Sequence, residues 1–175
     1  QDEIFPDKEH FGRIFRNNAV MSSRGINQIS AIMGSCVAGG AYLPIMSDEA
    51  MIVEGTGSIF LAGSYLVKAA IGEDVDNETL GGAETHCEIS GVTDYKAKDD
   101  ADALDKIKSI MNKIGDFEKA GFNKIPSKKP KSNPKDLFGL LPKSRADQYD
   151  MYEVINRLVD NSEIEEYKAD YGKTI

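Results

Sequence analysis

The sequence predicts a protein of the α/β class, and three observations support that prediction. Short apolar runs such as "NQISAIMG" and "EAMIVE" are enriched in β-branched residues, as buried strands are. Other stretches have helical periodicity, and "KDDADALDKIKSIMNKIG" is the clearest of them. Glycines stand at many of the junctions, as is typical of turns. Strands that alternate with helices in this way are typical of α/β proteins.

Local patterns predict the first four elements. Apolar residues at helical intervals predict a helix from Asp7 to Ser22. The run "NQISAIMG" predicts a buried strand, and a short loop is expected after Gly34. The segment "GGAYLPIMS" predicts an apolar helix, which Pro44 should distort or shorten because proline removes a helical hydrogen bond. The run "EAMIVE" then predicts the next strand.

The same alternation repeats further along the chain. "SIFLAG" predicts a short extended piece, and "SYLVKAAIG" predicts a helix with Ser64 as candidate N-cap and Gly72 as its end. From "DNETLGG" to "SGVTDY" we expect a turn of helix, a loop and a strand. "KDDADALDKIKSIMNKIG" predicts a half-buried amphipathic helix with Asp99 and Asp100 near its positive end. Its expected apolar face consists of Leu104, Ile107, Ile110, Met111 and Ile114.

The C-terminal third begins with a linker rich in proline and lysine, "NKIPSKKPKSNPK", which should be extended and solvated. In "DMYEVINRLVD" Asp150 and Glu153 have capping-box spacing, and Ser162 and Glu165 repeat it in "SEIEEYK", so two successive helices are expected. "YGKTI" has the pattern of an approach to a strand. Helices without a sheet cannot bury their apolar faces, so we expect the chain to be truncated here.

Composition argues against two classes of function. The 175 residues carry a formal net charge of −8, which opposes general binding to nucleic acid phosphates. The lysine-rich linker also lacks interleaved aromatic residues that could stack on bases, so no nucleic-acid partner is expected. No apolar run approaches the ~20 residues needed to cross a bilayer, so no membrane span is expected either. No targeting peptide is visible.

The cysteines and histidines do not form a recognisable metal or disulfide pattern. Cys36, Cys87, His10 and His86 lack the clustered spacing of a structural zinc site, and two cysteines do not make a secreted disulfide framework. A reducing compartment is the simplest interpretation, and no metal site is expected. An acidic cluster has magnesium-compatible groups, but a surface loop that follows a helix explains it equally well; it comprises Glu73, Asp74, Asp76 and Glu78.

The segment "MGSCVAGGAYLPIMSDEAMIV" has few reactive side chains, but its backbone could bind an anion. Glycines allow close approach to the main chain, and the unpaired amides at a helix start favour negative charge. An oxyanion could therefore be held near Gly39 and Gly40, although the pattern alone is weak and favours a plain packing turn. The segment is not a P-loop, because no lysine follows its glycines.

Nucleophilic catalysis is the weaker hypothesis for this region. Cys36 or Ser35 would need a histidine base, and His10 and His86 are the only histidines. A cysteine in an apolar loop is more often a small packing residue. We expect His86, which lies among glycines in "GGAETHCEISG", to orient a loop by hydrogen bonding rather than to act as an acid or base.

Several ordered motifs together resemble the carboxyltransferase (β) subunit of biotin-dependent acyl-CoA carboxylases. They are "MGSCVAGGAY", "SIFLAG", "LVKAAIGEDVDNETLGGAETHCEISGVTDY" and "YDMYEVINRLVDNSEIEEYKADYG". The resemblance covers nearly the whole chain and is strongest to the 3-methylcrotonyl-CoA carboxylase branch. It implies a crotonase-like (ClpP/crotonase) fold of stacked β-β-α units, present only in part.

The resemblance also implies a division into domains. Residues 1–126 would be the second half of the N-terminal carboxyltransferase domain, and residues 127–133 would be a Pro/Lys linker. Residues 134–175 would open a truncated C-terminal domain. The loop on the biotin side and the upstream CoA-binding part would lie outside the chain, so this fragment alone is expected to be inactive.

In the family that the motifs resemble, a carboxyl group passes from carboxybiotin to an acyl-CoA through a thioester enolate. The protein must stabilise oxyanions, and preorganised amides do this well. The family's oxyanion loop corresponds to "AGGA" here, so the resemblance implies that Gly39 and Gly40 donate to the thioester oxygen. Ala38, Ala41 and Tyr42 would shape the acyl pocket. The acyl group would be of the 3-methylcrotonyl or propionyl type.

Cofactor and partners follow from the same resemblance. Biotin would be carried by a partner protein or domain, the coenzyme A thioester would be the substrate, and carboxyltransferase subunits would form a homo-oligomer with a biotin carboxylase or biotin carrier subunit. The compartment would be the bacterial cytoplasm or the mitochondrial matrix. Two alternatives remain open, namely a biotin-dependent acyl-CoA decarboxylase subunit and a non-catalytic assembly module.

Overall fold

The computed structural model describes residues 11–114 and 126–174 of the chain. The chain divides into two units. The first unit contains Gln1–Lys113 together with Tyr167–Ile175, and the second contains Ile114–Glu166. Because the two units are not placed relative to each other, each is described by itself.

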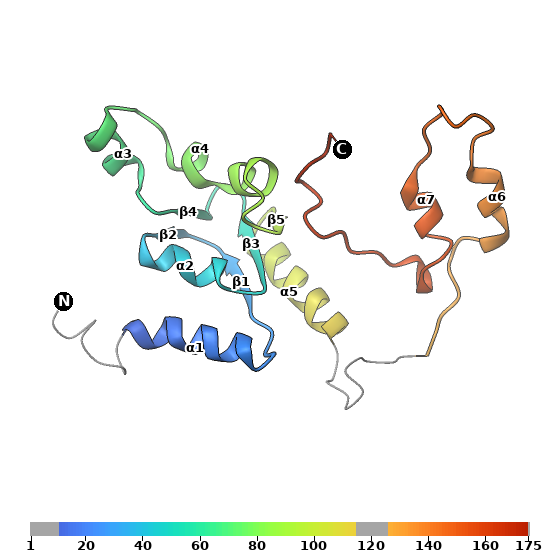
Figure 1. Cartoon of the computed structure of the whole chain (residues 1–175), viewed down its shortest axis with the longest axis horizontal. Coiled ribbons are helices and arrows are strands. Elements are labelled where there is room, and N and C mark those ends of the chain that lie inside the picture. The colour runs from blue at the N-terminus through green and yellow to red at the C-terminus, as the bar shows by residue number, and fades with distance from the viewer. Residues whose placement is uncertain (1–10, 115–125, 175) are drawn as a thin grey trace. The chain divides into compact units, whose positions relative to one another are not determined.

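The strands of the first unit form two parallel sheets (Figure 1). In the larger sheet β3 (Glu49–Val53) lies between β1 (Ile29–Ile32) and β5 (Tyr95–Ala97). In the smaller sheet β2 (Ser35–Val37) pairs with β4 (Ser58–Phe60). Parallel neighbours need crossover connections, and these bring helices onto the sheets.

Helices connect and cover these strands in a repeating order. Two strands and a helix, β1–β2–α2, are followed by two strands and a helix, β3–β4–α3, which makes two successive β-β-α units. This arrangement agrees with the stacked units implied by the family resemblance. The helices of the first unit are α1 (Phe11–Ser23), α2 (Gly39–Ile45), α3 (Ser64–Ile71), α4 (Asn77–Gly81), the π-helix η1 (Thr85–Ile89) and α5 (Asp100–Ile114).

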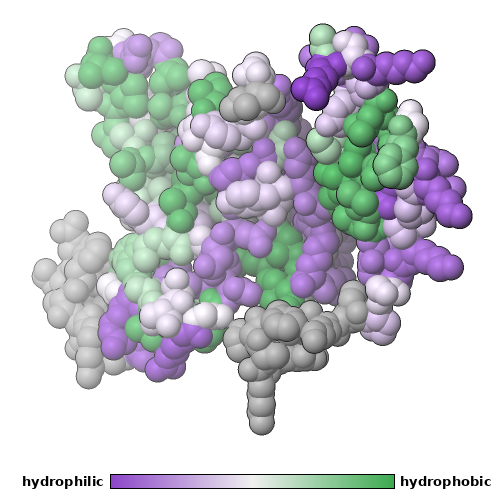
Figure 2. Space-filling model, turned by 45° about the vertical axis from the view of Figure 1, so that its right-hand side comes forward, coloured by the Kyte–Doolittle hydropathy of each residue, from purple (hydrophilic) through white to green (hydrophobic). Residues whose placement is uncertain are grey.

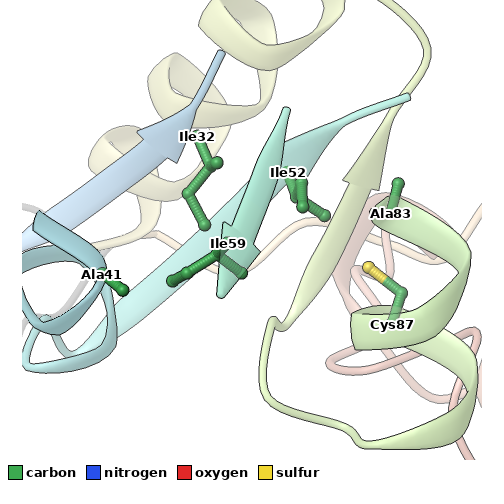
Figure 3. Packing of buried hydrophobic residues seen from close by; sticks show 6 residues of the cluster. All are labelled: Ile32, Ala41, Ile52, Ile59, Ala83 and Cys87. Carbon is green, nitrogen blue, oxygen red and sulfur yellow. The ribbon is translucent and has the colours of Figure 1, made fainter. Parts of the chain in front are cut away.

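The core lies where the two sheets meet α2 and η1 (Figure 3). β3 is flanked on both sides, which explains why "MIV" is a continuous apolar run that is almost completely buried. Gly57 lies where the chain passes from β3 to β4, and a Cβ there would be 2.3 Å from the carbonyl oxygen of Ile32. The main cluster of buried side chains consists of Ile32, Ala41, Ile52, Ile59, Ala83 and Cys87.

The structure confirms the first predicted elements with one exception. The helix begins at Phe11 as described, and the predicted start from Asp7 lies outside the described residues. The short loop expected after Gly34 is wrong, because β2 forms there. β2 was missed since its three residues acquire strand structure only by pairing with β4, where Ser35 Oγ lies 2.7 Å from Ser58 Oγ. As predicted, α2 is short and ends one residue after Pro44.

The next two predictions concern the ends of α3 and the segment between α4 and β5. Gly72 ends α3 in the left-handed conformation, as predicted, but the N-cap is Gly63 and not Ser64. Between α4 and β5 the expected loop contains the π-helix η1, and the strand begins only at Tyr95. The π-helix η1 has only five residues, which is too short to give a periodic pattern of apolar residues in the sequence.

Helix α5 was predicted correctly in its position, and its buried face was predicted in part. The carboxylate of Asp99 accepts a hydrogen bond from the Asp102 amide and caps the helix start. Ala103 and Ile110 are buried, whereas the side chains of Leu104 and Met111 are about half exposed. Ala103 is small and was therefore not counted in the apolar face, which the periodicity assigned to the larger side chains.

The second unit is built from short helices: η2 (Pro134–Asp136), α6 (Leu137–Leu140), α7 (Met151–Ile155) and η3 (Asp160–Ser162). Asp150 caps α7 as predicted, but Glu153 pairs with Arg157 rather than closing a capping box. The second helix expected after Ser162 is wrong, and the described residues after Ser162 form neither a helix nor the expected strand.

Ser162 forms different contacts from those of a cap. Its hydroxyl donates to the Asn156 carbonyl and accepts from the Lys131 amide, so it joins the linker to the end of α7. The Lys128 amide likewise donates to Asp160. The linker lies within the second unit; it is largely exposed and is bonded to the rest of that unit at Asp160 and Ser162. The domain limits at residues 126, 133 and 134 stay a prediction.

Candidate functional site

The site begins at the turn that links β2 to α2. The Ala38 amide donates to the Phe60 carbonyl over 3.1 Å, and this bond attaches the turn to the end of β4. Ala38 has φ 52° and ψ −121°, a conformation that residues with a Cβ rarely adopt. Such strain is retained only where the surroundings enforce it, and it is common at functional sites.

The amides of Gly39 and Gly40 follow this turn and have no hydrogen-bond acceptor among the described residues. Helix α2 begins at Gly39, so these two amides have no acceptor inside the helix. Ala38 provides no side-chain cap, and neither amide donates a hydrogen bond to another described residue. A Cβ at Gly40 would meet no atom within 4 Å, and one at Gly39 would only touch the Phe11 ring. The backbone here can therefore be approached by an external oxygen atom.

An apolar cavity of about 280 Å³ adjoins the same helix. Two of the predicted pocket residues, Ala41 and Tyr42, lie in its wall. The other predicted site residues, Ala38, Gly39 and Gly40, directly precede them in the chain but do not line the cavity. The complete wall consists of Ala41, Tyr42, Ile45, Ile59, Phe60, Leu61, His86 and Val92.

His86 is the polar group that sequence reasoning did not place at this cavity. Its Nε2 lies 2.7 Å from the Ile59 carbonyl oxygen, and its Nδ1 lies 2.9 Å from Ser90 Oγ. These two contacts show the hydrogen bonding that was predicted for His86, and its role in orienting a loop stays a prediction. Its position near the site could have been suspected from the preceding Gly-Gly pair, because paired glycines permit close packing of backbones.

The thiols do not have the properties of nucleophiles. Cys36 lies on β2, and burial raises the pKa of its thiol. Cys87 is buried, with its Sγ 3.1 Å from Thr93 Oγ1, and burial again raises the pKa of the thiol. Ser35 is bonded to another serine rather than to a histidine. The interpretation of Cys36 as a packing residue agrees with these surroundings.

Three members of the acidic cluster, Asp74, Asp76 and Glu78, make local structural contacts. Asp74 pairs with Lys68 over 2.7 Å, and Asp76 caps α4 through the Thr79 amide and hydroxyl, which lowers the pKa of Asp76. A Glu78 carboxylate oxygen accepts the Ala83 amide. Within residues 11–114 and 126–174, no group of three or more potential ligands is arranged to hold a metal ion. In the same ranges no helix is long and apolar enough to cross a membrane.

Comparison with known proteins gives consistent results. The carboxyl transferase domain family matches residues 1–175. The chain is 52% identical over its full length to the biotin-dependent 3-methylcrotonyl-coenzyme A carboxylase beta1 subunit of Mycobacterium tuberculosis, covering 33% of that protein. It is 46% identical to the mitochondrial methylcrotonoyl-CoA carboxylase beta chain of Arabidopsis thaliana, covering all of this chain and 31% of that protein.

A solved structure shows the same fold. The transcarboxylase 12S hexamer, determined with methylmalonyl-coenzyme A and methylmalonic acid bound, superposes with a TM-score of 0.79 at 30% identity. The match covers 93% of this chain and 32% of that chain. The present chain thus spans about a third of the length of the proteins that it matches.

Proposed function

Because the chain belongs to the carboxyl transferase domain family, we propose that it is part of the carboxyltransferase subunit of a biotin-dependent acyl-CoA carboxylase. The observation that carries this proposal is the 52% identity to a 3-methylcrotonyl-CoA carboxylase beta subunit over every residue of the chain. The substrate would be an acyl-CoA of the 3-methylcrotonyl or propionyl type.

The chemical role of this chain is to stabilise the enolate of the acyl-CoA. Removal of a proton from the α carbon of a saturated acyl-CoA, or from the γ carbon of 3-methylcrotonyl-CoA, gives an enolate with negative charge on the carbonyl oxygen. The free amides of Gly39 and Gly40 would donate hydrogen bonds to that oxygen. Each preorganised donor of this kind is typically worth about 3 kcal/mol in the transition state. Their rigid placement is supported by the strained turn at Ala38 and its bond to Phe60.

The acyl group would lie against the apolar wall formed by α2 and β4. Ala41 is small and buried, which leaves room, while Tyr42 is half exposed and can contact a ligand with its ring. Ala38 would contribute through its backbone conformation, since its side chain is not in the cavity wall. An apolar cavity of about 280 Å³ suits a short branched acyl chain better than a charged substrate.

Biotin does not fit the cavity of this chain by itself. The ureido group of biotin needs hydrogen-bond donors and acceptors, whereas the described wall is apolar apart from Tyr42 and His86, and both nitrogens of His86 already have partners. We therefore assign carboxybiotin, which supplies the carboxyl group, to a partner and to parts of the subunit outside this chain. The described residues act on the acyl-CoA.

Exposed apolar surface supports assembly with further protein. Figure 2 shows hydrophobic colouring gathered over the part of the first unit that carries β4 and α3. On α3 the side chains of Tyr65, Leu66 and Ile71 are 89%, 62% and 69% exposed. Surfaces of this kind are usually covered in an oligomer. We expect a homo-oligomer of carboxyltransferase subunits with a biotin carboxylase or biotin carrier subunit, in the bacterial cytoplasm or the mitochondrial matrix.

The test uses the full-length subunit with its biotinylated partner. Incorporation of labelled bicarbonate would be followed with ATP and 3-methylcrotonyl-CoA, propionyl-CoA or geranyl-CoA. We expect ATP-dependent carboxylation of at least one of them. No turnover of any acyl-CoA would contradict the proposal, and decarboxylation without ATP-dependent carboxylation would indicate the decarboxylase alternative. Calorimetry on the present fragment should show weak or no binding of CoA thioesters.

A further inference from the structure

We propose that His86 is a positioning residue for the oxyanion amides: by binding the Ile59 carbonyl it holds β4 in place, and β4 in turn holds the Ala38 turn that orients Gly39 and Gly40. The inference rests on the proposed function of these two amides. It assigns to His86 a role through the backbone rather than contact with the reacting atoms.

The first step is the hydrogen bond between His86 and β4. A carbonyl oxygen only accepts hydrogen bonds, so Nε2 of His86 carries the proton that it shares with Ile59. In the neutral ring Nδ1 then accepts, and the Ser90 hydroxyl at 2.9 Å is its donor. The Ser90 oxygen in turn accepts the Val92 amide at 3.3 Å. The ring is thus held from both sides and aimed at one carbonyl.

The second step explains why β4 needs this contact. Among the strands that the structure describes, β4 pairs with β2 alone, so its other edge is not paired with any of them. Toward β2 the Phe60 carbonyl accepts the Ala38 amide, and the neighbouring Ile59 carbonyl points to the opposite edge because peptide groups alternate along a strand. His86 donates to β4 at this second edge. The histidine and the Ala38 turn therefore hold adjacent peptide groups of β4 from opposite sides.

The third step is the close approach of the segment that carries His86. A Cβ at Gly81 would lie 2.2 Å from the Ile59 carbonyl oxygen, so only glycine allows α4 to come this near to β4. His86 then lies in the π-helix, where the Ser90 amide bonds to the Thr85 carbonyl five residues earlier. π-Helical turns are rare and often occur at functional sites. Two independent features, Gly81 and His86, thus converge on the same carbonyl oxygen.

The consequence for catalysis follows from the geometry of the turn. Ala38 keeps a positive φ, which is unfavourable for alanine, and its amide is held by Phe60. If β4 shifts outward, the turn at Ala38 can relax. The amides of Gly39 and Gly40 then no longer point toward the same oxygen. A displacement of about 1 Å at such donors is enough to lower a rate by about 100-fold. The contacts that bind the CoA thioester away from this turn should be affected much less.

The experiment measures steady-state carboxylation by the full-length subunit with its biotinylated partner. In His86→Leu the donor to Ile59 is removed, and we expect kcat to fall about 10- to 100-fold with the acyl-CoA KM within about threefold of wild type. In His86→Gln the side-chain amide can again donate to Ile59, and we expect recovery of about a third or more of kcat with the wild-type pH profile. Glu84→Gln, an exposed neighbour, is the matched control and should keep wild-type kinetics.

Specific results would overturn the inference. Wild-type kcat in His86→Leu would do so, and so would a folded His86→Gln enzyme as slow as His86→Leu, because the ring itself would then matter rather than its N–H donor. If His86→Leu does not fold, His86→Gln and Ser90→Ala decide: we expect partial activity in both, and loss of more than about 100-fold in His86→Gln would refute the role. An inactive wild-type enzyme would instead contradict the proposed function.

Discussion

The ammonium nitrogen of Lys168 lies 2.7 Å from Oδ1 of Asp94 and joins the last segment of the first unit to the residue before β5. The other carboxylate oxygen of Asp94 accepts the Ala50 amide, so the buried carboxylate is satisfied from two directions. Lys168 also donates to the Gly91 carbonyl and lies over the Tyr167 ring. The pair attaches residues 167–174 to Asp94, which in turn is bonded to β3 through Ala50.

Replacement of Lys168 should weaken the attachment of residues 167–174 to the rest of the first unit. In Lys168→Met the buried carboxylate of Asp94 keeps its bond to Ala50 but loses its counter-charge, so we expect the unfolding free energy to fall by about 2 kcal/mol. Urea denaturation of the present chain measures the change. Lys173→Met is the control, because Lys173 pairs with Asp170 at an exposed position. We expect this variant to lower the unfolding free energy by less than about 0.5 kcal/mol. Equal effects of the two variants would contradict the role of Asp94.

Tyr95 should remain protonated when ordinary tyrosines ionise. Burial raises the pKa of Tyr95 strongly, and the hydrogen bond from its hydroxyl to Glu49 over 2.8 Å raises it further. A group with a raised pKa in the folded state stabilises that state below its unfolded pKa, near 10, and loses this contribution as pH rises further. We therefore expect stability to fall above about pH 10, and to fall less in Tyr95→Phe.

The measurement is ultraviolet titration of tyrosinate on the folded chain, together with denaturation at several alkaline pH values. Wild type and Tyr95→Phe should titrate with the same amplitude up to about pH 11. A smaller amplitude in the variant in that range would show that Tyr95 ionises normally in the folded protein.

Gly40→Val should damage catalysis without damaging the fold. A Cβ at this position meets no protein atom within 4 Å, so the branched side chain fits the free chain but occupies the space that an approaching thioester oxygen needs. We expect kcat of the full-length enzyme to fall by about 100-fold or more. Gly12→Val is the matched control, because Gly12 is also the second described residue of a helix and also faces open space. An unchanged rate in Gly40→Val would refute the oxyanion role.

Gly57→Ala tests the crossing between β3 and β4. The added methyl group would lie 2.3 Å from the Ile32 carbonyl oxygen and 2.9 Å from that of Val53, and neither backbone can move easily inside the core. We expect the unfolding free energy to decrease by about 3 kcal/mol. Gly34→Ala, which has open space around it, should be close to neutral in the same urea denaturation. A neutral Gly57→Ala would mean that the two sheets are packed less tightly than the structure shows.

The sequence by itself determined the elements that carry their own periodicity. β1, β3 and α5 were predicted because strand-like apolar runs and helical amphipathicity are local properties of the chain. The ordered motifs also sufficed to identify the family resemblance, which the match over residues 1–175 confirms. The pair Gly39 and Gly40 was recognised as a candidate because glycines before an apolar helix are visible in the letters alone.

Only the tertiary structure decided the features that depend on partners distant in the chain. β2 is a strand because β4 pairs with it, and the second helix expected after Ser162 is absent because the serine hydroxyl bonds to Asn156 and Lys131 instead. Whether the Gly39 and Gly40 amides are free depends on the turn that Phe60 holds. His86 likewise reaches Ile59 across 27 positions. Hydrogen bonds between distant segments leave no periodic signal in a sequence, so their geometry emerges only when the chain is folded.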